Sequence, residues 1–418
     1  MPRLFSLFSL QVLAALLSVG CSQAKPVRVV LVTLDTLRYD RFAGEQACMP
    51  ELRELAREGL VFDQFYSATS STLPTHASLF TGLHPWEHGV PRNGTVLADE
   101  HRTLAERLQA AGFRTAAVIA SYAVHGKFRF DQGFDVYLDE LEDGHFNRAE
   151  VVTRAGLSLL DELEGDDQFL WLHYFDPHPP YGVSAGSNLR TAALHQAASR
   201  DPALVPPLLA RIVKLYDHDV AYLDASLAEV LRRVLDERDA YETHVVVTAD
   251  HGESFGEDGA FGHGKGLWRP QVHIPTILWS PALEPGARSD VAGSVDVLPT
   301  LLSLLGRPAE PGLPGRDLTR ASSERTQALG MRRTFVEPFE DVRADGSVVR
   351  VFEPSFYSVR DGVLSIGNRE SVSGEGAAND SELRQLFGEF EATLAAQPVH
   401  ELTDDETQDG LEDLGYTR

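Results

Sequence analysis

The chain has 418 residues, which is enough to bury a large core, and its formal net charge is −25 at pH 7. Such an acidic balance argues against nucleic acid or an acidic membrane surface as the main partner. A hydrophobic content of 43% is ordinary for a globular protein and excludes bulk disorder. An anionic substrate must therefore be attracted by local cations or by a metal ion, against the overall charge.

The N-terminus has the pattern of a targeting segment. Arg3 precedes the apolar run Leu4–Val19, which is short for a membrane span and leads into Gly20-Cys21. The last residues of this segment resemble a bacterial lipobox, although Ser18 occupies a place usually taken by Leu, Val or Ile. We therefore expect residues 1–21 to be a lipoprotein signal peptide and Cys21 to be lipidated, which would anchor the exported protein to the membrane, facing the periplasm or outer membrane. An ordinary cleaved signal peptide and a retained anchor are the alternatives.

Strand and helix patterns alternate after this segment. Apolar runs typical of parallel strands buried on both faces occur at Arg28–Leu34, Arg114–Ala120, Phe169–Phe175 and His244–Thr248. Amphipathic patterns predict helices at Pro50–Gly59, Thr103–Gly112, Ala149–Leu163 and Leu204–Leu235. This alternation predicts an α/β fold with a mostly parallel central sheet that is covered by helices on both faces.

The last part of the chain has a different pattern. A helix is predicted at Val295–Gly306, before a Pro/Gly-rich break. Short strands are predicted at Thr334–Glu337, Ser355–Arg360 and Val363–Ile366, and a helix at Ser381–Ala395. We expect a catalytic domain over residues 26–318 and a small α+β subdomain over residues 319–418.

Side chains that can bind metals or transfer protons follow the predicted strands. Asp35 follows the first strand, His178 lies just beyond the strand at Phe169–Phe175, and Asp250-His251 follow the strand at His244–Thr248. Ligands of open parallel sheets collect at the carboxyl ends of the strands, so we expect these residues to share one site.

Thr72 lies at the start of another predicted helix, shortly before Pro74. Threonine is a common N-cap residue, and this is the plain structural explanation. A helix N-terminus also stabilises an alkoxide or a bound anion, so the hydroxyl is a candidate nucleophile.

The segments Ser70–Pro85, His173–Tyr181 and Thr248–Glu253 together resemble the sulfatases of the alkaline phosphatase superfamily. Sulfatases carry Cys or Ser, which is converted to formylglycine, at the head of a Cys/Ser-x-Pro-x-Arg motif. Here Thr72 occupies that position and His76 occupies the Arg position. Because formylglycine cannot be made from Thr, the resemblance implies that Thr72 itself is the nucleophile and that His76 contacts the substrate.

The resemblance also implies one bound divalent metal ion. Thr36 stands where sulfatases usually have a second acid next to Asp35. Oxygen and imidazole ligands are compatible with Mg²⁺, Mn²⁺, Ca²⁺ or Zn²⁺. A second metal ion is not expected, because Asp176 and Asp217-His218-Asp219 do not have the spacing of two-metal members. The expected ligands are Asp35, Thr36, Thr72, Asp250 and His251.

Other site residues follow from the same resemblance. His178 would protonate the leaving group, with His263 as the rival general acid, and Lys265 would bind the developing oxyanion. Asn93 corresponds in position to a substrate-contacting Asn of phosphonate monoester hydrolases. Each of these residues could instead be an ordinary turn or loop residue, as Asn before Gly94 often is.

Three functions agree with these observations. The first is a metal-dependent hydrolase or transferase of phosphate esters, namely phosphodiesters, phosphonates or phosphoglycerol headgroups. The second is a sulfatase that acts without formylglycine. The third is a lipoprotein that binds an anionic glycan or lipid without turnover, which the off-pattern Thr36 and His76 favour. The substrate would be a small-molecule, glycan or lipid-headgroup ester, and the sequence does not indicate an oligomeric state.

Overall fold

The structure is a computed structural model that describes residues 25–142, 145–257, 261–320, 327–331, 339–351, 356–360, 363–367, 372–374 and 380–414. The predicted signal peptide, with Cys21, and the strand predicted at Thr334–Glu337 lie outside these ranges. Within these ranges, no helix is both long and apolar enough to cross a membrane.

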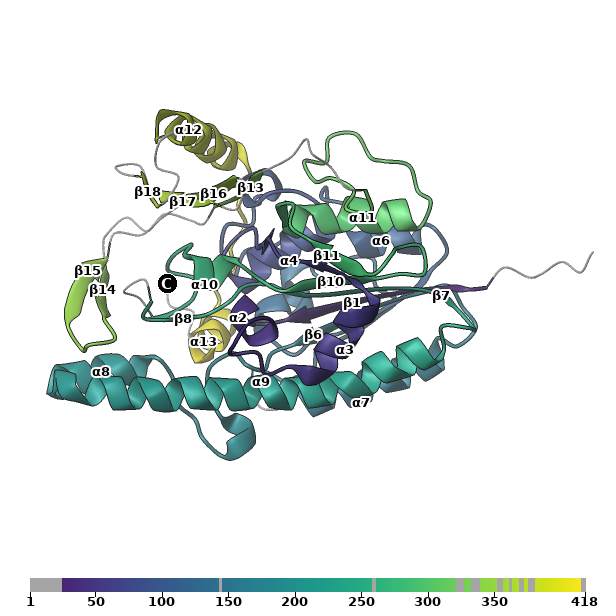
Figure 1. Cartoon of the computed structure of the whole chain (residues 1–418). Coiled ribbons are helices and arrows are strands. Elements are labelled where there is room, and N and C mark those ends of the chain that lie inside the picture. The colour runs from purple at the N-terminus through teal and green to yellow at the C-terminus, as the bar shows by residue number, and fades with distance from the viewer. Residues whose placement is uncertain are drawn as a thin grey trace, which may run out of the picture.

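An eight-stranded sheet forms the centre of the molecule (Figure 1), with the strand order β11-β2-β10-β7-β1-β6-β4-β5. Strand β10 is antiparallel to β7 and β2, and the other pairings in this sheet are parallel. The prediction of an α/β fold with a mostly parallel sheet is therefore confirmed. The strands are β1 (Val27–Leu34), β2 (Leu60–Phe62), β4 (Arg114–Val118), β5 (Val136–Leu138), β6 (Gln168–Tyr174), β7 (Glu242–Ala249), β10 (Thr276–Trp279) and β11 (Gly286–Arg288).

Helices cover both faces of this sheet, as expected from the alternating pattern. In Figure 1, α3, α7 and α9 lie on one side of the sheet, and α4, α6 and α11 lie on the other. The helices are α2 (Tyr39–Phe42), α3 (Pro50–Glu58), α4 (Thr72–Thr81), α5 (Pro85–His88), α6 (Leu104–Gln109), α7 (Ala149–Glu162), α8 (Ala192–Arg200), α9 (Val205–Asp236), α10 (Arg269–Val272) and α11 (Val297–Leu304).

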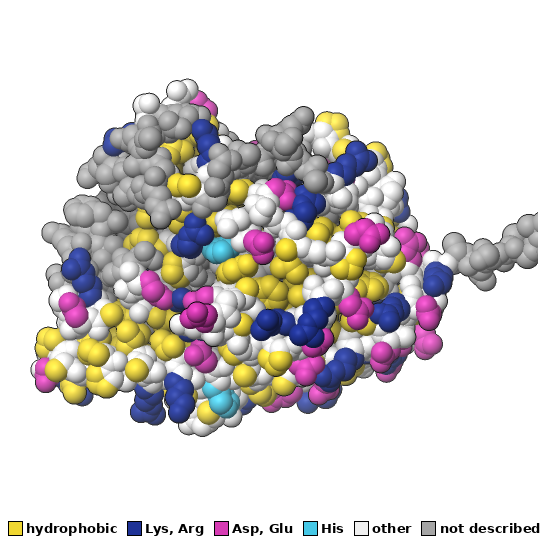
Figure 2. Space-filling view, viewed as in Figure 1, with side chains coloured by type: hydrophobic (Ala, Val, Ile, Leu, Met, Phe, Trp, Pro, Cys, Tyr) yellow, Lys and Arg dark blue, Asp and Glu magenta, His cyan; other side chains and the backbone are white. Residues whose placement is uncertain are grey.

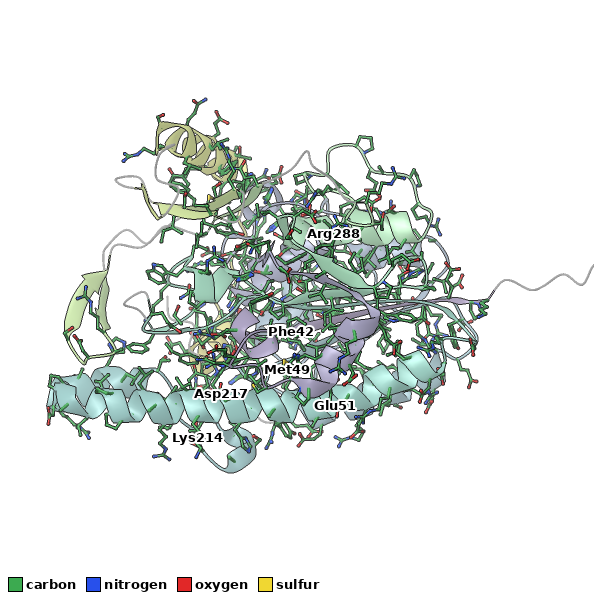
Figure 3. The ribbon with its side chains drawn as sticks, in the orientation of Figure 1. Phe42, Met49, Glu51, Lys214, Asp217 and Arg288 are labelled. Carbon is green, nitrogen blue, oxygen red and sulfur yellow. The ribbon has the colours of Figure 1, made fainter. Side chains whose placement is uncertain are left out.

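Local signals explain where these helices begin and which face they bury. Thr103 starts α6 with a capping box, in which its side chain accepts from the backbone N–H of Glu106 while the Glu106 side chain accepts from the N–H of Thr103. Helix α9 buries Ile212, Tyr216 and Val220 at helical spacing against the rest of the molecule. Figure 3 shows Phe42, Met49 and Asp217 close to one another, where α2 and the start of α3 meet α9.

The C-terminal part contains a small antiparallel sheet, as expected. Strand β16 (Phe356–Arg360) lies between β13 (Gln327–Met331) and β17 (Val363–Gly367), and β18 (Val372–Gly374) completes the sheet. Trp86 of α5 stacks on Phe390 of α12 with ring centroids 3.8 Å apart, which joins this part to the main domain. The remaining elements are β3 (Phe65–Tyr66), β8 (Ser254–Phe255), β9 (Phe261–Gly262), β12 (Ala292–Gly293), β14 (Phe339–Val342), β15 (Val348–Val351), α12 (Asp380–Ala396) and α13 (Asp405–Asp413).

The register of the central strands places the site. Leu34 at the end of β1 is paired with Tyr174 of β6 and with Ala249 of β7. The residues that follow these three strand ends, Asp35 and Asp250 among them, therefore meet at one edge of the sheet. On the face seen in Figure 2, basic and acidic side chains are interspersed, so the excess negative charge does not form one continuous patch there.

Candidate active site

Two carboxylates and one imidazole form a buried cluster at this edge of the sheet. Nε2 of His251 lies 3.7 Å from Oδ1 of Asp35 and 3.6 Å from Oδ2 of Asp250. All three side chains are fully buried. Nδ1 of His251 donates a hydrogen bond to the carbonyl of Gly252 at 3.0 Å, so that Nε2 keeps its lone pair on the side of the carboxylates.

Several polar atoms of this cluster have no hydrogen-bond partner among the described residues. They are both carboxylate oxygens of Asp35, Oδ2 of Asp250 and Oγ1 of Thr36. Buried polar atoms without partners cost free energy, and carboxylates cost the most. Burial and the charges of Asp250 and Glu253 raise the pKa of Asp35 well above its usual value. A divalent cation would satisfy these oxygens together with Nε2 of His251, so the residues present fit a metal ion.

Thr36 has an unusual backbone conformation at this site. Its φ angle is +54°, in the left-handed region that β-branched residues rarely adopt. This conformation directs the backbone N–H of Thr36 to Oδ1 of Asp250 at 3.2 Å. Local strain of this kind persists where surrounding contacts enforce it and is common at functional sites.

Thr72 lies next to the cluster, as predicted. It is the first residue of α4, and its Oγ1 is 3.4 Å from Nε2 of His251. Ser71 holds the N-cap position, but the side chain that caps the helix comes from Asn93, whose Oδ1 accepts from the N–H of Leu73 at 2.8 Å. The structure therefore places the Thr72 hydroxyl with the cluster rather than at the helix cap, and it gives Asn93 a role in fixing the nucleophile helix.

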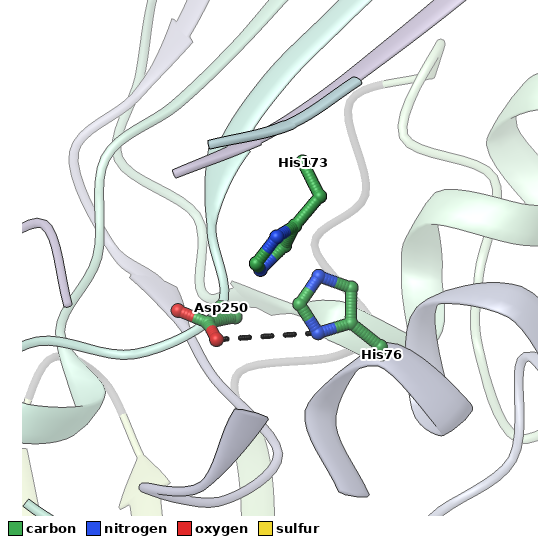
Figure 4. Close-up of side chains that lie close together, drawn as sticks. All are labelled: His76, His173 and Asp250. Carbon is green, nitrogen blue, oxygen red and sulfur yellow. Dashed lines mark ion pairs between the residues drawn. The ribbon is translucent and has the colours of Figure 1, made fainter. Parts of the chain in front are cut away.

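His76 has a supporting position behind Thr72, which differs from the substrate contact that we predicted. Its Nδ1 donates to the carbonyl of Thr72 at 2.8 Å, and its Nε2 is 3.0 Å from Oγ1 of Thr33. Because Trp171 Nε1 donates to the same Thr33 oxygen at 3.0 Å, the Thr33 hydroxyl is left to donate to His76. Figure 4 shows His76 beside His173 and Asp250, with Nδ1 of His76 3.9 Å from Oδ2 of Asp250.

This chain of hydrogen bonds gives a stability prediction. We expect Thr33→Val to lower the free energy of unfolding by about 1–3 kcal/mol, because His76 and Trp171 would each lose a buried partner. Urea denaturation of the purified protein measures this change. Thr243→Val is the matched control: Oγ1 of Thr243 is buried and has no partner among the described residues, so its removal should cost nothing. Equal losses in the two variants would contradict the prediction.

His173, in strand β6, also faces the cluster. Its Nδ1 accepts from the N–H of Ala120 at 3.4 Å, so its Nε2 carries the proton and lies 3.7 Å from Oδ2 of Asp35. Burial lowers the pKa of His173 well below its usual value, which keeps the ring neutral. His173 is thus a neutral neighbour of the Asp35 carboxylate.

His178 and His263 lie side by side above the cluster. Their ring centroids are 4.8 Å apart, and the ring of His263 is 4.5 Å from that of His251. Nδ1 of His178 donates to the carbonyl of Pro179 at 2.7 Å. Burial, followed by the neighbouring His263, lowers the pKa of His178 well below its usual value. Both predicted general acids therefore belong to this site.

Glu253 is a site residue that sequence reasoning missed. It is fully buried, and its Oε1 and Oε2 lie 3.2 Å and 3.3 Å from Nδ1 of His263. The hydroxyl of Tyr181 donates to Oε2 at 2.7 Å. A buried carboxylate on one imidazole nitrogen fixes the tautomer and orientation of the ring, so Glu253 positions His263. The sequence signal that could have identified Glu253 is its position directly after Asp250-His251-Gly252.

The loop that carries Lys265 passes beside the start of α4. An added Cβ at Gly264 would lie 3.6 Å from Oγ of Ser71, which shows how closely the two segments approach. Lys265 is half-buried at this position. The other acids named above have structural contacts: Asp217 forms an ion pair with Nε of Arg41 at 2.7 Å, and Asp176 accepts from the N–H of Ala149 at 2.8 Å.

Comparison with known proteins places this site in a family. Residues 28–307 match the sulfatase family. The uncharacterized sulfatase YidJ of Escherichia coli is 23% identical over 71% of this chain and 70% of its own length. An ulvan-active sulfatase of Formosa agariphila is 26% identical over 65% of this chain, which spans only 59% of that protein.

Solved structures share the fold at low sequence identity. The phosphonate monoester hydrolase SpPMH from Silicibacter pomeroyi superimposes with a TM-score of 0.64 at 21% identity, covering 88% of this chain and 94% of that one. The fold is thus alkaline-phosphatase-like, with a mixed central sheet and a small C-terminal antiparallel sheet. Because the family match extends over more than half of the chain, the protein belongs to the sulfatase family, a family of ester hydrolases within the alkaline phosphatase superfamily.

Proposed function

We propose that this protein is a metal-dependent hydrolase or transferase of phosphate esters, of the phosphodiester, phosphonate or phosphoglycerol type, with Thr72 as the nucleophile. The observation that carries the proposal is the position of Oγ1 of Thr72, 3.4 Å from Nε2 of His251 and close to the buried carboxylates of Asp35 and Asp250. Since Thr cannot become formylglycine, its own hydroxyl has to attack. A hydroxyl is weak at its free pKa and needs activation of the kind that a metal site supplies.

The residues that would hold the ion are Asp35, Thr72, Asp250 and His251, with Thr36 beside them. Such an ion supplies positive charge that lowers the pKa of the nucleophile and offsets charge on the ester oxygens. The N-terminus of α4 adds its own positive potential at Thr72.

The protein's own groups would then carry the reaction. Oγ1 of Thr72 would release its proton to water and then form a bond to phosphorus while the bond to the leaving oxygen breaks, which yields a phosphothreonine and an alcohol. We assign the donated proton to Nε2 of His263, because the carboxylate of Glu253 contacts Nδ1 and fixes the orientation of the ring, whereas burial keeps His178 neutral. Lys265 would contact the non-bridging oxygens. Water or a second alcohol would release the phosphoryl group from Thr72.

Glu253→Gln tests the assignment of the proton donor. We expect kcat/KM to fall about 10- to 100-fold, because a carboxylate that holds a catalytic imidazole in place contributes this much. The loss should be larger for a phenol leaving group than for 4-nitrophenol, which needs little protonation. Steady-state kinetics with both esters measures the difference. Glu257→Gln is the control, since Glu257 is exposed and pairs with Arg38. An equal loss for both leaving groups would contradict the role of His263.

The same geometry could serve a sulfate ester, and the sulfatase relatives favour this second candidate. The deciding experiment uses the chain from Ser22 onward, with and without Mn²⁺, Mg²⁺, Ca²⁺ or Zn²⁺. Aryl phosphate, phosphodiester, phosphonate and sulfate esters are assayed side by side. Metal-dependent cleavage of phosphorus esters supports the proposal, and faster cleavage of the sulfate overturns it. No turnover and no metal-induced thermal shift would favour a binding protein.

We further propose that the protein is exported and anchored through a lipidated Cys21. The apolar run before Cys21 and the lipobox-like ending support this proposal. Mass spectrometry of the protein from its native membrane should find Cys21 as an acylated N-terminus. An intact peptide that spans Ser18 to Lys25 would contradict it.

A further inference from the structure

A loop between His178 and α8 folds back beside the site. Tyr181 and Leu189 form an isolated antiparallel bridge, with N–H···O distances of 2.7 Å and 3.3 Å. Two residues after Leu189, Oγ1 of Thr191 lies 3.7 Å from where a Cβ on Gly262 would be, next to His263. Arg190, between these two anchored residues, is therefore held between the segment that carries His178 and the segment that carries His263.

Arg190 is a half-buried arginine in an acidic protein. Among the described residues, its guanidinium makes neither a hydrogen bond nor an ion pair. Asp413, the acid whose charge acts on it, is paired instead with Nδ1 of His145 at 2.9 Å. By contrast, Arg38 is paired with Asp40 and Glu257, each at 2.6 Å. Other arginines that make no ion pair among the described residues, such as Arg53, Arg200 and Arg211, are exposed to solvent, whereas Arg190 is half-buried.

The physical chemistry of Arg190 indicates that an anion binds it. Burial lowers the pKa of Arg190 and costs free energy, and the charge of Asp413 offsets only part of this effect. Its positive charge also contributes to the lowered pKa of His178, so the two groups are within electrostatic reach. The guanidinium nitrogens of Arg190 make no hydrogen bond among the described residues, and none of them is fully buried. They are therefore accessible to a ligand from solvent. A planar guanidinium matches carboxylate, sulfate and phosphate groups with two parallel hydrogen bonds.

We propose that Arg190 binds a second anionic group of the substrate, on the side of the leaving group, and thereby makes the enzyme selective for esters that carry two negative groups. This inference rests on the proposed function of the Thr72 site. It narrows the substrate class to esters whose alcohol part carries a carboxylate, sulfate or phosphate.

The test compares phenyl and 3-carboxyphenyl esters, each as the sulfate and as the methylphosphonate, with the metal-loaded protein. A carboxylate at the meta position changes the acidity of the phenol little, so the two leaving groups are chemically matched. We expect the wild type to prefer the 3-carboxyphenyl ester, and Arg190→Gln to lower kcat/KM for that ester about ten- to hundredfold while the phenyl ester is unchanged. Arg190→Lys should retain part of the preference. Arg200→Gln, on the exposed end of α8, is the control for loss of one positive charge.

Equal losses for both esters, or no loss for either, would overturn the proposal for Arg190 while leaving the Thr72 site in place. If the wild type cleaves none of the esters, the proposed function fails. The binding of phosphonates that are not cleaved then tests the role of Arg190 separately. Calorimetry should show tighter binding of 3-carboxyphenylphosphonate than of phenylphosphonate to the wild type, and no difference with Arg190→Gln. Equal binding to the wild type would overturn the proposal in that case too.

Discussion

Thr72→Val is expected to lower kcat/KM by at least about 10⁴-fold while the protein remains folded. The substitution removes the hydroxyl that lies 3.4 Å from Nε2 of His251 and keeps the shape of the side chain in the fully buried first turn of α4. The cap of that helix comes from Asn93 and not from Thr72, so the start of the helix should be retained. Kinetics with the best ester of the panel, together with a thermal melt, measures both effects.

Thr72→Ser provides the matched control, because it keeps the hydroxyl and loses one methyl group. It should retain most of the activity, and rapid acid quench of either active form should yield a peptide with a modified residue 72. Activity of Thr72→Val close to that of the wild type would show that another group, or water, attacks the ester. The prediction would also fail if Thr72→Ser were as inactive as Thr72→Val, since the methyl group and not the hydroxyl would then matter.

The main strands could be predicted because burial on both faces leaves a continuous apolar signature. Strands β1, β6 and β7 match the predicted runs closely, and their parallel register brings Asp35 and Asp250 together as expected. Strands β2 and β10 were not predicted, since stretches of three or four residues carry no periodicity that separates them from loops. Asp35, Asp250 and Thr72 could be predicted as site residues because carboxylates can bind metals and a hydroxyl can act as a nucleophile, and both could be located from the sequence alone.

The remaining parts of the site depend on contacts between distant residues. Glu253 is buried only because Tyr181, 72 positions earlier, and His263 fold against it. Residue preferences at helix starts predict that Thr72 caps α4, whereas in the structure Asn93 accepts from the N–H of Leu73, twenty positions earlier. His76 looked like a substrate ligand because it replaces an arginine, but Thr33 and the carbonyl of Thr72 occupy both of its nitrogens. Arg190 lies in a stretch with no motif, and only the absence of a partner among the described residues distinguishes it.

Asp35→Asn should have opposite effects on stability with and without metal. In a chelator, we expect it to raise the free energy of unfolding by about 1–3 kcal/mol, because it removes a buried charge whose two oxygens have no partner among the described residues. The pKa of Asp35 is raised in the folded protein, so the folded form binds the proton more tightly than the unfolded form. The wild type without metal should therefore lose stability as pH rises through that pKa, and Asp35→Asn should lose less.

With Mn²⁺, Mg²⁺, Ca²⁺ or Zn²⁺ added, the order should reverse. A metal ion that binds only the folded state stabilises the wild type, and the gain grows with the logarithm of the metal concentration relative to Kd. Asp35→Asn lacks one of the side chains that hold the ion, so it should gain less. Asp224→Asn is the control. Asp224 is also buried, but its carboxylate accepts from the N–H groups of Glu51 and Leu52, each at 2.9 Å. Its substitution should therefore destabilise the protein by about 0.5–2 kcal/mol both in chelator and with metal. Thermal melts in chelator and in each metal measure all three proteins. If Asp35→Asn and the wild type gained equally from every metal, Asp35 would not be a ligand, and the unpartnered carboxylate oxygens would need another explanation.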